Sequence, residues 1–293
     1  MKMRQQENGE RFSIKHYRKK EVDATTTLAE GPPFLDLKNW LNFITQYGII
    51  TESLWLIPHR DDSGVFEKLH HGEFIPQIPR QVILRFTKPY DLVVDPFVGY
   101  GTTLVECQRL GRNGIGVELE HEIAEIARRR IAQELNVYGV RVEVIEGDSQ
   151  RLNFRELLAA RGFEKASLII AHPPYHDIIK YGPSEENLAN KPNPESFLEA
   201  YGKVLDQALQ VLSKGGYFVL VIGDKYSKGE WVPLGFYTMN ETMKRGLKLK
   251  AICVKNIEET MAKRGQIHLW KYRTLKSGTY FFKHEYIMLF RKV

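Results

Sequence analysis

Short apolar runs alternate with helical patterns along most of this chain, and that alternation constrains the fold more than any other feature. Helices with one apolar face are expected to separate five short buried strands, at residues 92–95, 114–118, 141–145, 167–171 and 217–222. Strands that alternate with helices at this spacing form a mostly parallel sheet covered by helices on both faces. The sequence therefore predicts an α/β fold with a doubly wound sheet. Two further apolar runs, at 248–254 and 285–291, are expected to add an antiparallel pair at its C-terminal edge.

The chain has 293 residues, of which 43% are hydrophobic and 27% charged, so a packed core is expected. We expect residues 61–293 to form this core domain and residues 1–60 to form a polar extension with helical character. In a doubly wound sheet, ligands bind at the carboxyl ends of the strands, near the point where the strand order reverses. The functional residues are therefore expected just after the strand ends at Asp95, Glu118, Ile145 and Ala171.

A loop with two glycines follows the first of these strands and reads Asp-Pro-Phe-Val-Gly-Tyr-Gly-Thr-Thr at residues 95–103. Gly99 and Gly101 let the backbone turn sharply and approach a ligand closely, and the helix that follows presents its free N–H groups. The loop differs from the GxGxxG of dinucleotide sites and lacks the lysine of a phosphate-binding loop. Taken alone, it is also compatible with a simple tight turn.

Carboxylates follow the next two strands. Glu118 ends the second strand, where an acid can accept hydrogen bonds from ribose hydroxyls. Asp148 follows the third strand, where it can accept a hydrogen bond from an adenine amino group. Each acid by itself is also explained as a helix cap or a surface residue. Arranged around one glycine loop, the acids after the first three strands suit a nucleoside ligand that has no pyrophosphate.

The fourth strand runs into His172-Pro173-Pro174-Tyr175, at the edge where the chemistry is expected. An aromatic amino group is a poor nucleophile because its lone pair is delocalised into the ring. Oriented acceptors for its N–H groups favour a pyramidal nitrogen with a free lone pair. The two prolines fix the backbone so that a carbonyl near His172 or Pro173 can be one acceptor, and Tyr175 can stack on the base. As an isolated sequence, Pro-Pro-Tyr also fits a turn after a strand.

Both motifs resemble those of the DNA methyltransferases that act on amino groups, the N4-cytosine and N6-adenine enzymes. The loop matches Asp-Pro-Phe-x-Gly-x-Gly-Thr-Thr, residues 110–118 resemble the stretch that follows it, and His-Pro-Pro-Tyr is similar to the Asp/Asn/Ser-Pro-Pro-Tyr motif. The resemblance covers about residues 70–291 and implies a class I methyltransferase fold with a Rossmann-like sheet. The cofactor loop precedes the tetrapeptide, which is the reverse of the order in many relatives and indicates a permuted arrangement.

The resemblance implies that S-adenosylmethionine is the cofactor, that Glu118 contacts its ribose and that Asp148 contacts its adenine. Its methionine part is expected against the loop, at Asp95, Pro96, Phe97, Gly99, Gly101, Thr102 and Thr103. In the family the segment before the first strand closes over the methionine end of the cofactor. The resemblance therefore assigns Pro76 to Arg80 to this role. The expected catalytic residues, which act on a base flipped out of the duplex, are His172, Pro173, Pro174 and Tyr175.

His172 departs from the family motif, and a neutral imidazole accepts a hydrogen bond only in the right tautomer. The tetrapeptide, with Tyr181-Gly182 downstream, is closer to the Ser-Pro-Pro-Tyr enzymes, which favours cytosine N4 as the target; adenine N6 is the first alternative. An RNA amino-group methyltransferase is the second alternative, although no RNA-binding module is recognisable. A non-catalytic nucleic-acid-binding relative is the third. The intact cofactor residues argue against it, namely Gly99, Gly101, Glu118 and Asp148.

DNA recognition is assigned to two inserts, 176–194 and 241–280, because no large separate recognition domain is visible. The second interleaves basic and aromatic residues at 267–273, as phosphate-and-stacking surfaces do, although a strand with one buried face would show the same pattern. The candidate DNA-binding residues are Lys180, Tyr181, Lys225, Lys263, Arg264, Lys271 and Arg273. Of these, Lys225 is expected in a substrate-side loop or a solvated turn. Double-stranded DNA is the expected partner. If the enzyme is paired with a restriction enzyme rather than solitary, a cognate restriction endonuclease is a second expected partner.

The net charge of +6 and the pI of about 9.1 agree with a polyanionic partner, although solvated helix faces also carry such charge. Cys107 and Cys253 have neither the spacing of a zinc site nor that of a disulfide framework. We therefore expect no bound metal, and we expect the protein to work in a reducing compartment. The longest apolar run is too short to span a bilayer, and the N-terminus lacks a signal-peptide core. We therefore expect a cytoplasmic protein that has no membrane partner.

Overall fold

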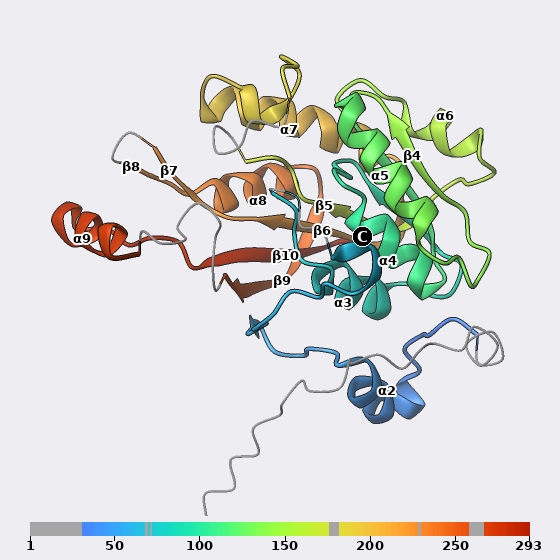
Figure 1. The fold of residues 1–293 in the computed structure, drawn as a ribbon. Coiled ribbons are helices and arrows are strands. Elements are labelled where there is room, and N and C mark those ends of the chain that lie inside the picture. The colour runs from blue at the N-terminus through green and yellow to red at the C-terminus, as the bar shows by residue number, and fades with distance from the viewer. Residues whose placement is uncertain (1–30, 68–69, 71, 176–181, 228–229, 258–266) are drawn as a thin grey trace, which may run out of the picture.

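The computed structural model describes residues 31–67, 70, 72–175, 182–227, 230–257 and 267–293, and a twisted sheet lies at its centre (Figure 1). Within these residues the sheet has eight strands, in the order β1-β9-β10-β6-β5-β2-β3-β4. The strands are β1 (Leu54–Trp55), β2 (Leu92–Asp95), β3 (Asn113–Glu118), β4 (Val142–Glu146), β5 (Ala166–Ala171), β6 (Leu212–Ile222), β9 (Leu247–Asn256) and β10 (His284–Lys292).

Strands β4, β3, β2, β5 and β6 are parallel to their neighbours in this series, which confirms the predicted α/β fold and its mostly parallel sheet. β10 runs antiparallel to both β6 and β9, so the expected antiparallel pair is present. One detail refines the prediction. β10 itself lies between β6 and β9, and the two-residue β1 pairs in parallel with β9 as the last strand.

Helices cover both faces of this sheet (Figure 1). Successive residues of β2 point to opposite faces, so that Val93 shares a core cluster with Ile83 while Val94 shares one with Phe197. Burial on both faces explains why the strands are apolar runs without alternation. The helices are α2 (Trp40–Tyr47), α3 (Gln77–Phe86), α4 (Thr102–Leu110), α5 (His121–Gln133), α6 (Phe154–Ala159), α7 (Pro194–Ala208), α8 (Leu234–Lys244) and α9 (Ile267–Ser277).

The strand order reverses between β2 and β5, because β3 and β4 lie on one side of β2 while β5 and β6 lie on the other. β2 and β5 are parallel, with Val94 opposite Ile169, so their carboxyl ends lie at the same edge of the sheet. A doubly wound sheet leaves a crevice at this reversal. The glycine loop after Asp95 and the turn after Ala171 are therefore neighbours in space, although they are far apart in the sequence.

Part of the N-terminal extension is built into the sheet. Residues 1–30 lie outside the described residues, Phe43 of α2 packs in the core cluster beneath the sheet, and β1 pairs with β9. The sheet thus includes a strand from before the expected boundary at residue 60. None of the helices in the described ranges is long and apolar enough to cross a bilayer.

Two segments differ from the alternatives that the sequence left open. Residues 267–277 form the helix α9 rather than a strand with one buried face; unbranched Leu, Lys and Arg side chains in this stretch favour a helix. Lys225 opens a short antiparallel hairpin, β7 (Lys225–Ser227) and β8 (Glu230–Val232), where a loop or turn was expected. Both cysteines are buried and free, as expected for a chain without a disulfide framework.

Arg112, at the start of the segment that leads into β3, is fully buried and holds three parts of the chain together. Its guanidinium donates to Thr87 Oγ1 at 2.9 Å, to Thr87 O at 3.0 Å, to Pro33 O at 2.6 Å and to Leu110 O. Burial lowers the pKa of Arg112 to about 10, which still leaves it charged at neutral pH. A fully buried charge is tolerated here because all three nitrogens of the guanidinium group donate hydrogen bonds to acceptors.

Arg112→Met should therefore reduce the free energy of unfolding by about 3 kcal/mol, because three backbone carbonyls and one hydroxyl lose a buried donor. Urea denaturation followed by circular dichroism measures this change. Arg155→Met, at an exposed position near the start of α6, is the matched control and should change stability by no more than about 0.5 kcal/mol. Equal effects of the two substitutions would contradict the anchoring role.

Candidate active site

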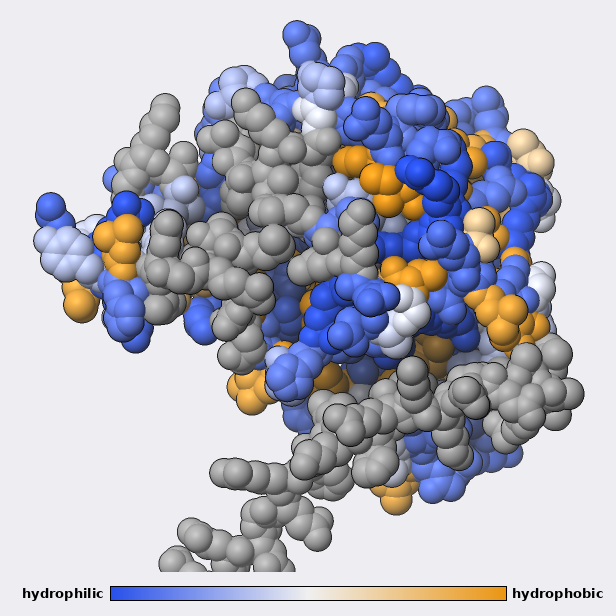
Figure 2. All heavy atoms as spheres, viewed as in Figure 1, coloured by the Kyte–Doolittle hydropathy of each residue, from blue (hydrophilic) through white to orange (hydrophobic). Residues whose placement is uncertain are grey.

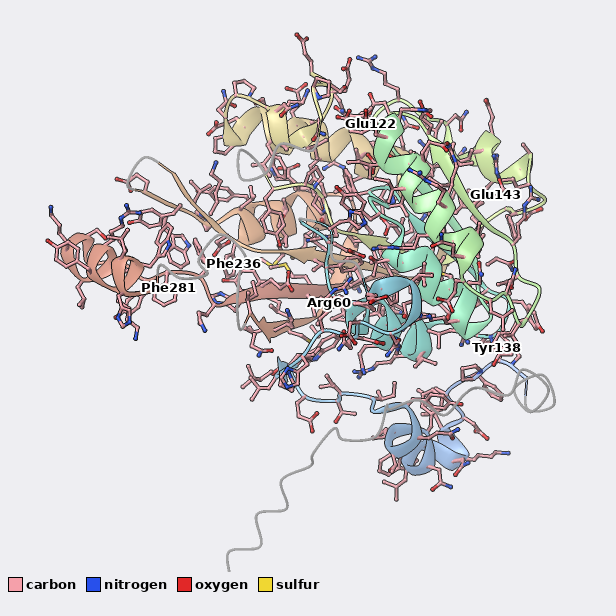
Figure 3. All side chains as sticks on the ribbon, in the orientation of Figure 1. Arg60, Glu122, Tyr138, Glu143, Phe236 and Phe281 are labelled. Atoms are coloured by element: carbon pink, nitrogen blue, oxygen red, sulfur yellow. The ribbon has the colours of Figure 1, made fainter. Side chains whose placement is uncertain are left out.

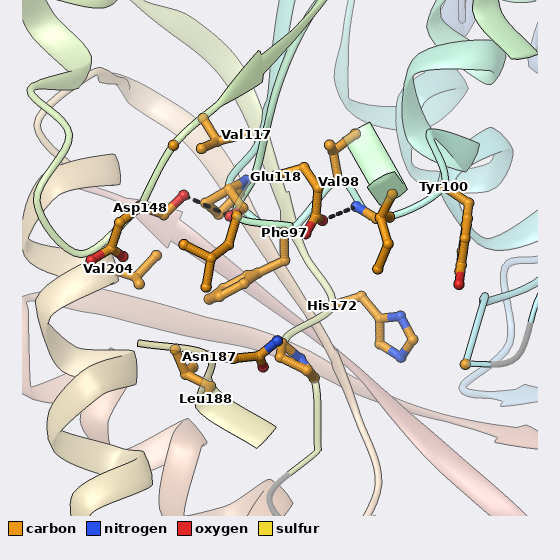
Figure 4. Close-up of a pocket in the computed structure, with 18 of the residues that line it drawn as sticks. Phe97, Val98, Tyr100, Val117, Glu118, Asp148, His172, Asn187, Leu188 and Val204 are labelled. Atoms are coloured by element: carbon orange, nitrogen blue, oxygen red, sulfur yellow. Dashed lines mark hydrogen bonds between the residues drawn. The ribbon is translucent and has the colours of Figure 1, made fainter. Parts of the chain in front are cut away.

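A pocket lies at the carboxyl edge of the sheet, where the strand order reverses (Figure 4). About 780 Å³ of non-atom space lies within its walls, and part of this space is open to solvent. Eight of the residues predicted from the sequence line it, namely Pro96, Phe97, Gly99, Thr102, Glu118, Asp148, His172 and Pro174. Five other predicted residues lie beside the pocket and outside its lining, namely Asp95, Gly101, Thr103, Pro173 and Tyr175.

Asp95 braces the glycine loop from inside. Its Oδ1 accepts a hydrogen bond from the Phe97 N–H at 2.9 Å, and its Oδ2 accepts one from Thr103 Oγ1 at 2.6 Å. These bonds join the end of β2 to the first turn of α4. Gly101, at φ +86°, has its α-carbon so close to α5 that an added Cβ would lie 3.2 Å from Ala127 Cβ. Asp95 and Thr103 therefore shape the loop, and Gly101 lets it pack on α5.

Glu118 closes the loop from the next strand. Its Oε2 accepts from the Gly99 N–H at 3.0 Å, and its Oε1 accepts from the Glu120 N–H at 2.9 Å. Burial raises the pKa of Glu118, and these two backbone donors oppose that rise. Each carboxylate oxygen still has a second lone pair, so Glu118 can accept hydrogen bonds from ligand hydroxyls in the pocket that it lines.

Asp148 offers the pocket an acceptor. Its Oδ1 accepts from the backbone N–H of Gln150 at 2.9 Å and from the Gln150 side chain at 3.2 Å. Its Oδ2 is buried, and nothing in the described parts of the chain donates a hydrogen bond to it. The nearest cation is the Nε of Arg151 at 3.6 Å, on a side chain that is 75% exposed. A buried acceptor of this kind calls for a donor, and the exocyclic amino group of an adenine fits that requirement.

His172 lies between two aromatic rings at the end of β5. Its ring centroid is 4.9 Å from that of Phe74 and 5.6 Å from that of Tyr175, the latter in an edge-to-face arrangement. Tyr175 in turn packs over Gly223, where an added Cβ would meet its ring at 3.4 Å. The turn is thus held by ring contacts on both sides of the imidazole.

The imidazole of His172 is neutral at pH 7. Burial lowers its pKa, and the nearby Lys255 ammonium lowers it further, while the Glu285 carboxylate acts in the opposite direction. Lys255 and Glu285 form a buried ion pair at 3.2 Å, and of the two the Glu285 carboxylate has the larger effect on the pKa of His172. A neutral imidazole has one ring nitrogen that accepts and one that donates.

Sequence reasoning missed the first wall of the pocket, which is formed by Gly72, Glu73 and Phe74. The segment assigned to this position, Pro76 to Arg80, is instead the start of α3, and its Arg80 bonds Glu106 and Asp61. Residues 76–80 are therefore not among the residues that line the pocket. The segment before the first strand does line the pocket, but it does so before α3 begins.

Glu73 holds that wall in place. Its side chain is 2% exposed and forms ion pairs with Arg130 and with Arg60, the latter at 3.3 Å. It also accepts a hydrogen bond from Thr102 Oγ1 at 2.5 Å. One carboxylate therefore connects the segment before α3 with α5 and with the first residue of α4.

Sequence reasoning also missed a second wall, formed by Glu186, Asn187 and Leu188. These residues belong to the insert 176–194, which was assigned to DNA recognition. The Asn187 amide donates to Glu120 Oε1 at 3.0 Å, and the Gln150 side chain donates to Glu186 O at 2.9 Å. This part of the insert therefore borders the pocket. The signal that was available was the polar run Glu186-Asn187, but nothing in the sequence indicates where it packs.

The predicted DNA-binding residues fall into three groups. Lys180, Tyr181, Lys263 and Arg264 lie outside the described residues. Lys225, at the base of the β7–β8 hairpin, is only 2% exposed, so its burial does not support a contact with phosphate. Lys271 and Arg273 are exposed on α9. Asp224, next to Lys225, accepts from the Gly235 N–H at 2.9 Å and from the Tyr286 hydroxyl at 3.2 Å, so it has a structural role.

Comparison with known proteins gives one match over most of the chain. A family model described as DNA methylase matches residues 4–129 and 166–293. The Type II methyltransferase M2.DpnII of Streptococcus pneumoniae is 50% identical over 54 residues, which are 18% of this chain and 20% of that protein. The Type II methyltransferase M.HpaI of Haemophilus parainfluenzae is 32% identical over 89 residues, 30% of this chain and 28% of that protein. The chain therefore spans less than a third of the length of either relative.

A solved structure, TrmN from Thermus thermophilus, aligns with a TM-score of 0.48 and 16% identity, over 75% of this chain and 49% of that chain. This likeness is too weak to support any inference about the site.

Burial raises the pKa of Asp95 from 3.8 to about 7, with Glu118 adding to the rise and the Thr103 and Phe97 hydrogen bonds opposing it. In the unfolded chain this carboxyl is ionised above about pH 4, whereas in the folded chain it keeps its proton up to about pH 7. The folded state therefore binds more protons between these values, and its stability falls as the pH rises through them.

Asp95→Asn should remove that fall, because the amide has no proton to lose. Urea denaturation at several pH values between about 4 and 8 should show a decline in wild-type stability of at most about 4 kcal/mol that the variant lacks. Asp62→Asn, at an exposed position, should keep the wild-type slope. Identical slopes for wild type and Asp95→Asn would refute the assignment to Asp95.

Proposed function

The chain belongs to the DNA methylase family, and we propose that it transfers a methyl group from S-adenosylmethionine to an exocyclic amino group of a base in double-stranded DNA. One observation carries this proposal: the glycine loop, the two acids and the His-Pro-Pro-Tyr turn meet in one pocket at the reversal point of the sheet. A pocket shared in this way brings a methyl donor and an acceptor together, and such positioning supplies much of the rate of a transfer reaction.

The residues present fit S-adenosylmethionine, which supplies a methyl group on a positively charged sulfur. Asp148 Oδ2, a buried acceptor without a donor in the described chain, would accept from the adenine amino group. Glu118 would accept from the ribose hydroxyls with its remaining lone pairs. The backbone at Gly99, Tyr100 and Thr102, which lines the pocket at the start of α4, would lie along the methionine part.

The turn after β5 would prepare the target nitrogen. The neutral ring of His172 and a carbonyl at His172 or Pro173 accept its N–H groups, so that its lone pair is released from the ring. When bound, S-adenosylmethionine would supply a methyl group whose bonding electrons stay on sulfur. The lone pair of the target nitrogen would take up that methyl group, and the His172 imidazole would accept one N–H proton from the nitrogen. Tyr175 supplies an aromatic ring for stacking, and the base reaches this turn only when it is flipped out of the duplex.

Within this reaction we favour cytosine N4 as the target, because the tetrapeptide is closer to Ser-Pro-Pro-Tyr than to Asp-Pro-Pro-Tyr; adenine N6 is the alternative. Because the named relatives are Type II methyltransferases, we also propose a cognate restriction endonuclease as a partner in the cell. An RNA substrate and a non-catalytic relative are the competing hypotheses that a direct assay must exclude.

Incubation with methyl-labelled S-adenosylmethionine should label duplex DNA and leave tRNA unlabelled. Digestion of the labelled DNA to nucleosides should then release N4-methylcytosine, while N6-methyladenine would identify the alternative target. Tyr175→Ala should abolish the labelling and keep cofactor affinity within about threefold, because its ring lies beside the turn and outside the pocket lining. Labelled tRNA with unlabelled DNA, or no transfer at all, would overturn the proposal.

The role of His172 gives a prediction in pH. Because burial lowers its pKa from the ordinary value of 6.5, the wild-type kcat/KM should be constant at neutral and higher pH and should fall only at a pH below that ordinary value, where the imidazole becomes charged. His172→Asn, whose amide oxygen still accepts a hydrogen bond, should keep measurable transfer without this acidic fall. His172→Leu should lose at least about 100-fold. A shared pH profile for wild type and His172→Asn would exclude the imidazole from the chemistry.

A further inference from the structure

Two segments project from the same edge of the sheet as the pocket. The hairpin β7–β8 follows the end of β6, and residues 257–283, which include α9, connect the end of β9 to the start of β10. β6 and β9 both run antiparallel to β10, so they end at one edge. Figure 1 shows the hairpin and α9 extending beyond the sheet on that side. We call α9 and this hairpin together the arm.

The base of the arm is fixed to the sheet by aromatic and polar contacts. Trp231 of β8 packs on Phe282, with ring centroids 4.3 Å apart, and its indole N–H donates to Asp224 Oδ2 at 3.2 Å. The same carboxylate oxygen accepts from the Tyr286 hydroxyl on β10. The hairpin and the chain that returns from α9 are therefore joined to each other and to a strand beside the catalytic turn.

The arm carries positive charge without any acid in its helical segment. From residue 260 to residue 284 the sequence has six Lys or Arg and no Asp or Glu. Lys271, Arg273 and Lys276 are exposed on α9. A run of positive charge at the edge of the sheet that holds the pocket attracts a polyanion and repels a basic surface. Charge complementarity therefore selects a nucleic acid as the occupant.

Exposed apolar side chains lie among these charges. Leu269, Tyr272 and Leu275 are 43%, 62% and 84% exposed. Leu269, Arg273 and Lys276 are spaced i, i+4 and i+7, so an apolar and two basic side chains share one face of α9. A helix that packs against another protein separates apolar and charged residues onto different faces. The mixture, which Figure 2 shows as orange and blue residues side by side on α9, is instead suited to phosphates and the apolar groups of bases.

The dimensions of α9 fit a DNA groove. Its 11 residues make a rod roughly 16 Å long and about 10–12 Å wide, which matches a major groove about 12 Å wide. Figure 3 shows side chains projecting from α9 around its axis, with Phe281 between it and the sheet. Tyr272 and Leu275 of α9 remain largely exposed in the described structure, so this part of the helix surface is accessible to a groove.

We propose that α9 lies in the major groove of duplex DNA beside the target base and provides much of the affinity for the duplex, a role that rests on the proposed methyl transfer to DNA. Lys271, Arg273 and Lys276 neutralise phosphates or contact base edges, and Tyr272 and Leu275 cover apolar groups. The contacts of Trp231 with Phe282 and Asp224 set the position of the helix relative to the pocket.

The test is the triple variant K271Q/R273Q/K276Q. Fluorescence anisotropy with a labelled duplex should show roughly 30-fold or greater loss of affinity, and the slope of log Kd against log salt should fall by roughly 2 to 3, since three cations no longer displace counterions. S-adenosylmethionine affinity and the melting temperature should stay unchanged, because all three side chains are exposed and outside the pocket. Single R273Q, a milder change, should show an intermediate loss.

The matched control is K165Q/K214Q/K248Q, which removes the same charge from exposed lysines near the amino ends of β5, β6 and β9, at the opposite edge of the sheet. It should change duplex affinity by less than about threefold. Equal losses in the two triple variants would overturn the proposal, because net charge alone would then explain the binding. So would an arm variant that binds duplex DNA like wild type, or a wild type that binds duplex RNA more tightly than DNA.

The two proposals fail in different ways. Wild type that binds duplex DNA through α9 but transfers no methyl group would overturn the proposed function and leave the arm in place. If the wild type methylates DNA and the triple arm variant keeps the same kcat/KM, the proposed role of α9 in DNA binding would be overturned. The proposed methyl transfer would stand. A second copy of the chain could also bind the exposed helix, and analytical sedimentation of wild type and the arm variant tests this. A wild-type dimer that becomes a monomer in the arm variant, with DNA affinity unchanged, would also overturn the proposal.

Discussion

One buried carboxylate sets the shape of the site. Asp95 accepts from Phe97 N–H and from Thr103 Oγ1, so a loop with two glycines is tied at both ends before any ligand arrives. Glu118 adds a third tie through the N–H of Gly99. Without these bonds the loop would have many accessible conformations, and a ligand would have to order it on binding. Burial has a cost that is visible in the raised pKa of Asp95.

The periodic parts of the sequence were sufficient to predict the sheet, its reversal point and the residues that follow the strands. Strand ends are local features, so Glu118, Asp148 and His172 were found where the strands stop. Phe74 and Leu188 were not, because their places in the pocket depend on packing between segments that are distant in sequence. α9 was ambiguous because its interleaved basic and aromatic residues are compatible with a strand that has one buried face as well as with a helix. The buried position of Lys225 likewise follows from its place at the base of the hairpin, which composition does not reveal.

The wall at Gly72 to Phe74 depends on a different interaction. Glu73 is almost fully buried, yet it is shared among Arg130, Arg60 and Thr102, which satisfies its charge from three directions. Buried ion pairs contribute little net stability when compared with apolar packing, but removing one partner is costly. The arrangement therefore serves position more than stability: it holds a segment from before α3 against the start of α4.

The ring contact between Phe74 and His172 has a thermodynamic consequence. Phe74 belongs to the wall of the pocket that would receive the donor, and His172 belongs to the turn that would receive the acceptor, so a displacement of one ring changes the room available to the other. A ligand that moves one of these rings would therefore change the affinity for a ligand that contacts the other ring, and the change would be reciprocal by the same factor.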